Sequence, residues 1–353
     1  MIVFKHTRCK RDAIRILGIM IVLACGCVAE GWAAGPAAVI TDAAGRVIPV
    51  SQPFQRVISL YGAHTENLFK MGAEDVLIGV GRNDVYPPRV SSLPGFSYHD
   101  GPERFLAAAP DLVLIRPMID RGYAPLIQRL EQSGITVVSL QPGTIEEMVA
   151  YWRILGLLTG QETRAEAMIT AFQQAVADFQ ALAASVQVPK RVYFEAIHKR
   201  MKTFSPGSMP IFALETAGGV NVAADADRVR TTNIAYYGKE RILSRAAEID
   251  VYLAQQGAMN QPSPALISNE PGFDVIKAVK AGQVFIVDET IVARPTWRLL
   301  YGINTIGNML YPEHFRDNGA RIIQTAEVAL RAVATGARSN PKESKVSHEE
   351  SNR

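Results

Sequence analysis

Cysteine is scarce in this chain of 353 residues, and its absence from most of the sequence excludes several classes of site. The three cysteines, Cys9, Cys25 and Cys27, all lie within the first 29 residues. The remaining chain therefore has no disulfide framework, no thiolate nucleophile and no zinc site built from cysteine. A chain of this length buries about 75% of its unfolded surface, so it can fold without such covalent support.

Long hydrophobic runs are also lacking. The apolar run near the N-terminus, ILGIMIVLA at residues 16–24, is shorter than the roughly 20 residues that span a bilayer. It follows five basic residues and precedes several small ones, which is the pattern of a secretory signal. We expect residues 1–34 to be a signal peptide and the protein to be periplasmic. A loose lipobox at residues 22–25 makes lipid anchoring through Cys25 the less favoured alternative.

The chain has no strong excess of charge once this segment is set aside. Residues 1–29 contain five Lys or Arg and one Asp, so the remainder has 32 basic and 33 acidic side chains. Nothing in the charge indicates a nucleic-acid partner. The polar tail at residues 336–353 has no aromatic residue, and we expect it to be disordered.

Enzyme motifs are absent as well. Residues 78–84 (IGVGRND) begin like a dinucleotide-binding loop, but the third glycine is replaced by Asp84 and two prolines interrupt the helix that should follow. The sequence has no Gly-x-Ser-x-Gly elbow and no phosphate-binding P-loop. We therefore predict a protein that is not an enzyme and has no cofactor.

Short aliphatic runs alternate with amphipathic stretches through most of the chain, which predicts α/β units with mostly parallel sheets. The strands are expected at residues 56–60, 76–80, 112–115, 136–140, 191–195, 251–254 and 284–287. Helices are expected at residues 66–71, 103–109, 124–133, 299–309 and 320–334.

This alternation stops between about residues 145 and 186. From Ala165 the sequence has apolar residues at helical spacing, which predicts one helix of about 25 residues. We therefore predict two α/β lobes joined by one long, rigid helix. The expected limits are 39–143 for the N-terminal lobe, 144–188 for the helical connection and 189–335 for the C-terminal lobe.

A similar sequence motif occurs once in each lobe. Residues 101–117 (GPERFLAAAPDLVLIRP) and 238–256 (GKERILSRAAEIDVYLAQQ) share Gly-x-Glu-Arg, a short helical stretch, Asp and an aliphatic run. An acid at a helix start is favoured by the helix dipole, which explains Glu103 or Glu240 taken alone. Their matched positions suggest a shared role for the two lobes.

Ligands of open α/β lobes meet the loops beyond the carboxyl ends of the strands. Arg groups in such loops suit anionic ligands, and aromatic rings give flat apolar contact. Loop histidines are more often polar surface than metal ligands, so we predict no bound bare ion. The predicted ligand-contact residues are His64, Arg82, Tyr86, Tyr98, Arg116, His198, Lys199, Met201, Arg294 and Trp297.

The chain resembles the substrate-binding proteins of ABC importers that carry vitamin B12 and ferric siderophores. The resemblance is in residues 56–81 (RVISLYGAHTENLFKMGAEDVLIGVG), Pro87-Pro88 and residues 103–115, and it continues in the C-terminal lobe through Ala217-Gly218-Gly219 and residues 240–251. It covers about residues 39–334. No single motif is diagnostic, but the order and spacing together are specific.

The resemblance implies two Rossmann-like lobes with a ligand cleft between them. It also implies that Glu103 and Glu240 dock onto an ABC permease dimer in the membrane. We expect a monomer that captures a ferric siderophore, with a corrinoid (cobalamin) or haem or another metal chelate as the alternatives. A periplasmic sensor or an unrecognised enzyme is the alternative of another class. The long helix should keep the movement between the lobes small.

Overall fold

The computed structural model describes residues 38–230 and 232–336. The predicted signal peptide therefore lies outside the described residues. The predicted tail also lies outside them, except for Gly336, which is the last residue of helix α13. Within the described ranges, no helix is both long and apolar enough to cross a membrane.

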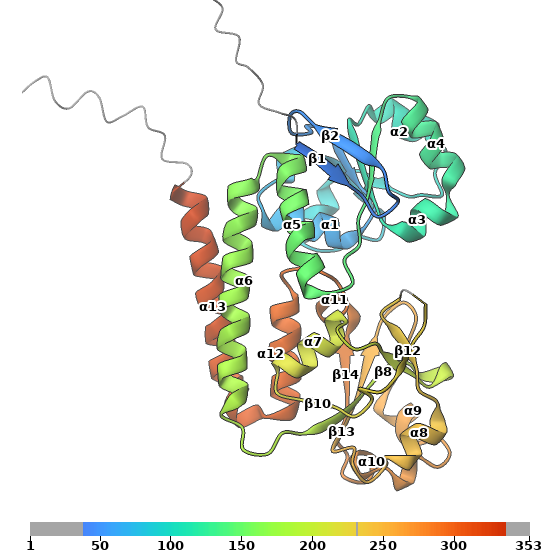
Figure 1. Cartoon of the computed structure of the whole chain (residues 1–353), viewed down its shortest axis with the longest axis vertical. Coiled ribbons are helices and arrows are strands. Elements are labelled where there is room, and N and C mark those ends of the chain that lie inside the picture. Colours follow the sequence, from blue (N-terminus) through green and yellow to red (C-terminus); the bar gives the residue numbers. More distant parts are fainter. Residues whose placement is uncertain (1–37, 231, 337–353) are drawn as a thin grey trace, which may run out of the picture. The chain divides into compact units, whose positions relative to one another are not determined.

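The N-terminal lobe contains a five-stranded sheet in which all neighbouring strands are parallel (Figure 1). Its order is β5-β4-β3-β6-β7. The strands are β3 (Val57–Ser59), β4 (Leu77–Gly81), β5 (Gly95–Phe96), β6 (Leu112–Ile115) and β7 (Thr136–Ser139). The associated helices are α1 (Gly62–Lys70), η1 (Glu74–Val76), η2 (Pro88–Ser92), α2 (Pro102–Ala108), α3 (Pro117–Gly122) and α4 (Ala124–Gln132). A hairpin of β1 (Ala38–Thr41) and β2 (Val47–Val50) precedes them.

The C-terminal lobe contains a mixed sheet in the order β11-β12-β9-β8-β13-β14, with β10 also paired to β8. The pairs β8–β13 and β13–β14 are parallel, whereas β9, β11 and β12 add antiparallel strands. The strands are β8 (Arg191–Ile197), β9 (Lys202–Phe204), β10 (Val220–Asn221), β11 (Asp227–Arg228), β12 (Ile234–Tyr236), β13 (Val251–Gln256) and β14 (Val284–Asp288). The helices are η3 (His198–Arg200), α7 (Met209–Thr216), α8 (Lys239–Ser244), α9 (Pro264–Ser268), η4 (Phe273–Val275), α10 (Lys277–Lys280) and α11 (Glu289–Val292).

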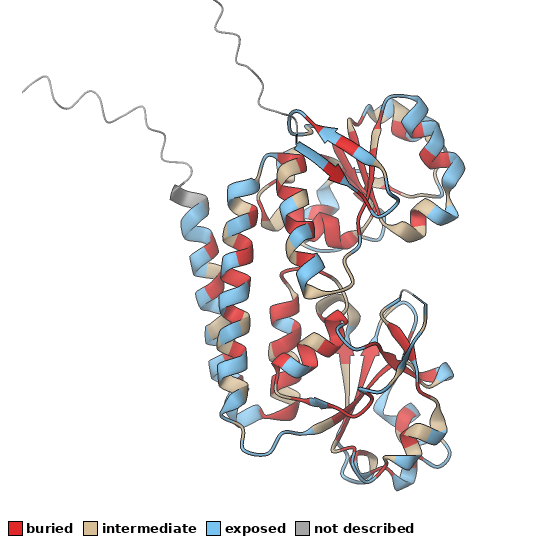
Figure 2. Cartoon of the chain, viewed as in Figure 1, coloured by how far each residue is buried: buried red, intermediate tan, exposed pale blue. Residues whose placement is uncertain are grey.

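The seven strands expected from aliphatic runs are all present, within two residues of the predicted limits. Every residue of β6 is buried, because helices cover both faces of a parallel sheet and leave no side of the strand in water. Figure 2 shows the same pattern, with buried strands inside and helices whose outer faces are exposed. The mixed α/β fold with two lobes is confirmed.

The predicted connecting helix is α6 (Glu162–Ala184), and it is preceded by α5 (Ile145–Thr159). Gly156 lies within α5, which continues through it. A Cβ at this position would lie 2.7 Å from the Cβ of Ala165, so the glycine lets α6 approach closely. Gly160 ends α5 in the left-handed conformation, with a φ of 68°.

Helix α6 is supported by other helices along its length. The C-terminal helix α13 (Pro312–Gly336) packs along α6, and α12 (Leu299–Leu310) packs against both of them (Figure 1). The buried face of α6 includes Met168, Phe172 and Phe179, at the spacing of an amphipathic helix. Bending α6 would therefore disturb a packed layer as well as its own hydrogen bonds.

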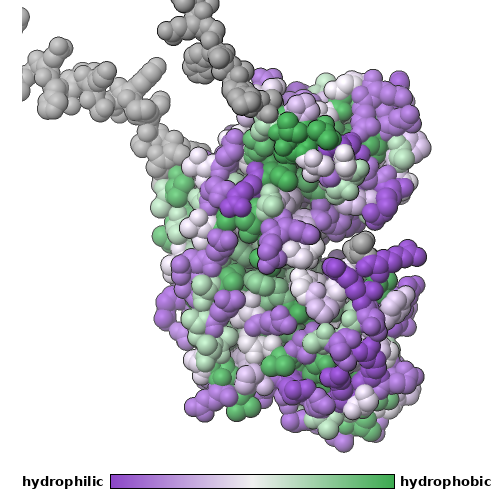
Figure 3. Space-filling view, viewed as in Figure 1, coloured by the Kyte–Doolittle hydropathy of each residue, from purple (hydrophilic) through white to green (hydrophobic). Residues whose placement is uncertain are grey.

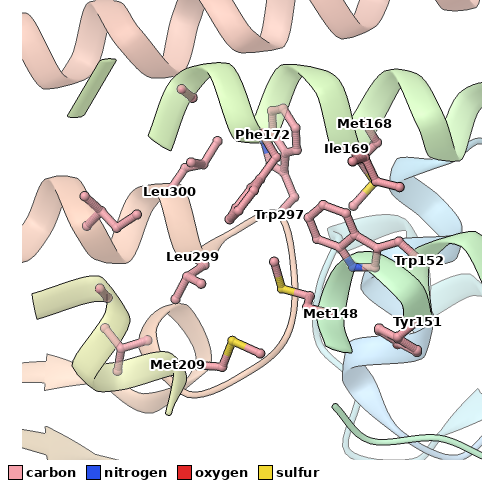
Figure 4. Packing of buried hydrophobic residues seen from close by; sticks show 14 of the residues in the cluster. Met148, Tyr151, Trp152, Met168, Ile169, Phe172, Met209, Trp297, Leu299 and Leu300 are labelled. Atoms are coloured by element: carbon pink, nitrogen blue, oxygen red, sulfur yellow. The ribbon is translucent and has the colours of Figure 1, made fainter. Parts of the chain in front are cut away.

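Aromatic rings join α5, α6 and the segment before α12 in one buried core (Figure 4). The ring of Phe172 lies edge-on to Trp152 at 5.2 Å and is tilted against Trp297 at 6.4 Å between centroids. Trp297 is only 3% exposed, and its indole Nε1 donates to Glu327 on α13 at 2.7 Å. The same carboxylate accepts from Lys70 of α1 at 2.6 and 2.7 Å.

A buried polar network extends from this aromatic core into the N-terminal lobe. Because a carbonyl only accepts, His64 Nε2 must donate to Ile115 O at 2.9 Å, and Nδ1 then accepts from Tyr151 at 2.7 Å. Asn67 donates to the Tyr151 hydroxyl and to Pro295 O. Burial lowers the pKa of His64 to about 4, so its imidazole is neutral at pH 7.

Gly302 allows α12 to lie against the segment that carries Arg294. A Cβ at Gly302 would lie 2.2 Å from the carbonyl oxygen of Ile291. A glycine-to-alanine change inside a helix normally stabilises by about 0.5–1 kcal/mol, but here we expect G302A to destabilise by about 1–3 kcal/mol. G122A is the control, because no atom lies within 4 Å of its added Cβ. Chemical unfolding measures both, and a G302A protein as stable as the wild type would contradict the packing.

The neutral His64 predicts a pH dependence of stability. The pKa of His64 is about 4 in the folded protein against an ordinary value of 6.5, so the unfolded chain binds more protons between these pH values. Stability should therefore fall as the pH drops from 6.5 to 4. In H64Q we expect the free energy of unfolding to fall by about 2–3 kcal/mol less than in wild type over this pH range. H314Q, which changes an exposed histidine, should show the full fall. Parallel unfolding free energies of H64Q and wild type across this range would refute the explanation.

Candidate functional site

A cleft of about 540 Å³ lies between the two lobes. From the N-terminal lobe it is lined by residues that follow all five parallel strands, as expected for the carboxyl edge of such a sheet. These residues are Leu60, Tyr61, Gly62, Gly81, Arg82, Asn83, Asp84, Phe96, Ser97, Tyr98, His99, Arg116 and Gln141. The C-terminal half of the chain contributes Asn233, Ile234, Gln255, Ala258, Met259, Glu289, Ala293 and Arg294.

Four of the ten predicted ligand-contact residues come together in this cleft. They are Arg82, Tyr98, Arg116 and Arg294, which follow β4, β5, β6 and α11 respectively. Figure 3 shows hydrophilic side chains gathered along the rims of the hollow on this face. Three guanidinium groups from distant parts of the sequence therefore line one space.

The three arginines differ in whether a carboxylate of the protein pairs with them. Arg116 has its guanidinium carbon 5.0 Å from the centre of the Tyr61 ring, and within the described residues no carboxylate pairs with it. Arg82 pairs with Asp100 at 2.8 Å but its side chain is 56% exposed. Arg116 is therefore the cation in the cleft that is most available to a ligand.

Arg294 is tied to the N-terminal lobe. Its Nη1 lies 2.9 Å from Oε1 of the buried Glu66, and Arg298 lies 3.6 Å from the same oxygen. Burial raises the pKa of Glu66, and the two arginines oppose that rise. Arg294 also covers Gly62, where any Cβ would lie 2.7 Å from Nη1. The guanidinium is thus held in place at the base of the cleft.

Aromatic rings form one wall. Tyr98 lies 4.6 Å from His99 and 4.7 Å from Tyr123, measured between centroids, and His99 meets Tyr123 edge-on. Such a cluster gives a rigid apolar surface with polar edges. It is suited to contact with a large, flat or bulky ligand.

Two acidic residues also line the cleft, Asp84 and Glu289. Asp84 accepts from Thr65 at 2.6 Å and from the backbone of Gly81 at 3.2 Å. Burial raises the pKa of Asp84. Both hydrogen bonds go to Oδ2, so this oxygen is engaged by the protein. Among the described residues, no three His, Cys, Asp or Glu side chains come together as a metal site.

The structure places His64 and Trp297 in the core and not at the cleft. His64 has no exposed surface and both ring nitrogens are hydrogen-bonded within the protein. Trp297 is packed between α6 and α13, as described above. Each follows a strand in the sequence, but its side chain points into the packed layer of helices that connects the lobes.

Tyr86 and Met201 also lie outside the cleft lining. The Tyr86 ring is 40% exposed and faces the guanidinium of Arg298 at 4.3 Å. Met201 has a φ of 45°, ends η3 and packs against the core of the C-terminal lobe. His198 and Lys199 line a second cavity that adjoins the cleft.

Several lining residues were not among the predicted contacts. Gln141 directly follows the strand at 136–140, so the strand-end rule applied to β7 would have found it. Asn233 and Ile234 come from the β11–β12 hairpin, where no alternating apolar pattern marked a strand. Glu289 lies on α11, a helix of four residues that is too short to show a periodic pattern.

Glu103 and Glu240 occupy equivalent positions in the two lobes. Each is exposed, each lies in the first turn of a short helix, α2 or α8, and each follows a glycine at the helix start. No ion pair to either carboxylate is found among the described residues. Both carboxylates are therefore open to an external partner.

Comparisons with known proteins agree with this architecture. A model of the periplasmic binding protein family matches residues 57–290. The chain is 24% identical over 79% of its length to an uncharacterised ABC transporter substrate-binding lipoprotein of Bacillus subtilis (strain 168), covering 87% of that protein. It is 25% identical over 72% of its length to a vitamin B12-binding protein of Vibrio cholerae serotype O1, covering 88% of it.

A solved structure from Staphylococcus epidermidis, described as a possible iron-binding periplasmic solute-binding protein, has the same fold. It superposes with a TM-score of 0.66 at 24% identity, over 74% of this chain and all of that one. The family match spans more than half of the sequence and includes both lobes. The chain therefore belongs to the periplasmic binding protein family, and it is a substrate-binding protein of the kind that serves ABC importers.

Proposed function

We propose that this protein is the extracytoplasmic component of an ABC importer that captures a ferric siderophore in the interlobe cleft and delivers it to the permease. The observation that carries the proposal is the guanidinium of Arg116, which lines the cleft beside two further arginines and has no carboxylate partner among the described residues. A guanidinium pairs well with carboxylate and other anionic oxygens. The cleft volume of about 540 Å³ is within the range of small-molecule sites.

The balance of charge favours an anionic chelate. Three arginines line the cleft against two acids, and one of these acids, Asp84, is already hydrogen-bonded within the protein. The Tyr98 and His99 rings offer apolar contact to the organic shell of such a chelate. Binding would require the oxygens of the ligand to replace the water around Arg116.

A corrinoid is the second candidate, because a relative at 25% identity is named a vitamin B12-binding protein. The aromatic wall suits the corrin ring as well as a siderophore. Haem or another metal chelate is the third candidate, since its carboxylates would also suit the arginines. Relatives of this chain are named as binding proteins, which supports a carrier over the alternatives of a periplasmic sensor or an unrecognised enzyme.

We propose that the lobes move little on binding. The connection is reinforced by α5, α12 and α13, and Lys70, Asn67 and Glu66 of α1 each bond to residues after position 293. We retain 39–143 and 189–335 as the proposed limits of the lobes. Residues 293–298 nevertheless contact both the N-terminal lobe and the helices that connect the lobes.

Docking to the permease is assigned to Glu103 and Glu240. Both carboxylates are exposed and unpaired among the described residues, and one stands on each lobe. A permease built from two similar subunits would present a pair of matching basic sites. The proposed complex is thus one binding protein, acting as a monomer, on one permease dimer.

The first test is direct binding to the chain from residue 37 onward. Ferric siderophores, cobalamin and haemin are titrated and followed by calorimetry, and native mass spectrometry then shows whether the ligand is recovered unchanged. We expect R116Q to weaken the binding of the anionic ligand about 10-fold or more, because a charge-assisted hydrogen bond contributes about 1.5–3 kcal/mol.

The control for this test is R129Q, at an exposed arginine of α4 that lies outside the cleft and forms no ion pair with another described residue. It removes the same charge and should leave the affinity unchanged. Equal affinities of R116Q and wild type would remove the main support for the anionic cargo. Chemical conversion of the ligand would instead favour an enzyme.

The second test concerns docking. The double variant E103R/E240R should bind the ligand as wild type does but lose most uptake, because two attractive contacts with basic residues become repulsive. The control is E146R/E313R, which makes the same change in the first turns of α5 and α13. Uptake assays in cells with the cognate permease compare the two, and normal uptake by E103R/E240R would refute the docking role.

A further inference from the structure

A second cavity, of about 520 Å³, lies within the C-terminal lobe. We call it the side pocket. It is bounded by the segment after β8, the loop after β13 and one residue of α9. Its lining residues are Ile197, His198, Lys199, Arg200, Ala258, Met259, Asn260, Gln261 and Leu266. Seven of these belong to two segments that follow neighbouring parallel strands, β8 and β13.

Buried hydrogen bonds fix the walls of the side pocket. Asn260, only 5% exposed, accepts from the backbone N–H of His198 at 3.0 Å and donates to Gln255 O at 3.0 Å. Gln261 donates to the carbonyl of Gly257 at 2.7 Å. The two loops are therefore joined to each other directly, so the cavity is a preformed feature of the lobe.

A buried carboxylate lies behind the wall. Glu195 has no exposed surface and is bound by His198 Nδ1 at 2.8 Å, by the Tyr252 hydroxyl and by Asn260. The hydrogen bond to Glu195 raises the pKa of His198, although burial opposes the rise. Glu270, which lies 3.7 Å from His198 Nε2, is itself paired with Lys239 at 2.6 Å. Glu195 is thus hydrogen-bonded within the protein, and Glu270 has Lys239 as its cation partner.

Lys199 and Arg200 remain as unmatched positive charges at the side pocket. Both are exposed, and no ion pair to either is found among the described residues. The lining includes no carboxylate. Beside these cations, Met259 and Leu266 are 60% and 47% exposed. A positive rim next to open apolar side chains suits a group that is anionic at its end and apolar along its length.

The side pocket adjoins the interlobe cleft. Ala258 and Met259 line both spaces, so the side pocket and the cleft meet at these two residues. We propose that the side pocket receives an anionic arm of the same ligand, which ends at Lys199 and Arg200; this rests on the proposed carrier function. The core of the chelate occupies the cleft, and the arm gives selectivity among chelates with similar cores.

This assignment predicts discrimination between ligands that differ mainly in an acidic arm. Ferrichrome and ferrichrome A have the same kind of ferric hydroxamate centre, but the acyl arms of the second end in carboxylates. Cobalamin has a phosphate-linked nucleotide arm that cobinamide lacks. Haemin has two carboxylates that its dimethyl ester lacks. Whichever pair the wild type binds, the acid-bearing member should bind about 10-fold or more tightly.

The test compares K199Q/R200Q with wild type in calorimetric titrations of these pairs. The variant should lose the preference for the acid-bearing member and bind the other member as before. Both changes are at exposed positions, so folding should be unaffected, which thermal unfolding checks. The matched control is K280Q/R321Q, which removes one lysine and one arginine from exposed positions on α10 and α13. It should retain the preference.

The outcomes separate the side pocket from the carrier function. If wild type binds a chelate but K199Q/R200Q changes the affinities of both members equally or not at all, the side pocket is refuted and the carrier function stands. If wild type binds no member of any pair, both proposals fail. Inorganic phosphate is titrated as well. If wild type binds phosphate, K199Q/R200Q does not, and wild type shows no preference within the pairs, the side pocket is a site for a free anion. That result would refute the proposal that it receives an arm of the ligand.

Discussion

The carbonyl oxygen of Pro295 is the point on which the arrangement of this protein depends. It accepts from Asn67 of α1 at 2.9 Å and from the indole of Trp152 on α5 at 3.4 Å. Pro295 lies between α11 and α12, so its carbonyl is not part of a helix, and both donors are buried side chains. Loss of both donors would leave this carbonyl unpaired in the interior, which costs about 1–3 kcal/mol. The neighbours of Pro295 are thereby held against the N-terminal lobe.

The contacts that connect the two lobes also position a residue of the cleft, so the stability of the fold and ligand binding are linked. Glu66 lies on α1 beside Asn67, and it is Glu66 that holds Arg294 at the cleft. A buried carboxylate is tolerated there because two guanidinium groups lie within 4 Å of it. Arg116, in contrast, lies over the face of Tyr61 and pairs with no carboxylate among the described residues. The protein therefore positions one cation with an ion pair and leaves another for the ligand.

Much of the fold could be predicted from the sequence, because aliphatic runs such as LVLI at residues 112–115 mark buried parallel strands. The antiparallel strands β9, β11 and β12 are only two or three residues long and carry no such mark. The site was predicted less completely. The strand-end rule found Arg82, Tyr98, Arg116 and Arg294, but it gives only the position of a residue and not the direction of its side chain. His64 and Trp297 follow strands too, yet they turn into the core, where Tyr151 and Glu327 satisfy their polar atoms.

Arg294 follows a strand of the C-terminal lobe in sequence, but its contacts with Glu66 and Gly62 belong to the other lobe. Any relative displacement of the lobes would therefore carry Arg294 along with Arg82 and Arg116. The C-terminal side of the cleft has neutral Asn233, Gln255 and Met259 and the acidic Glu289 in its lining, and its cations Lys199 and Arg200 lie in the adjoining side pocket and not in the cleft. Electrostatic attraction thus concentrates on one half of the cleft. An incoming anion would meet the N-terminal half first, at a rate that falls with ionic strength, and the opposite half would complete the enclosure afterwards.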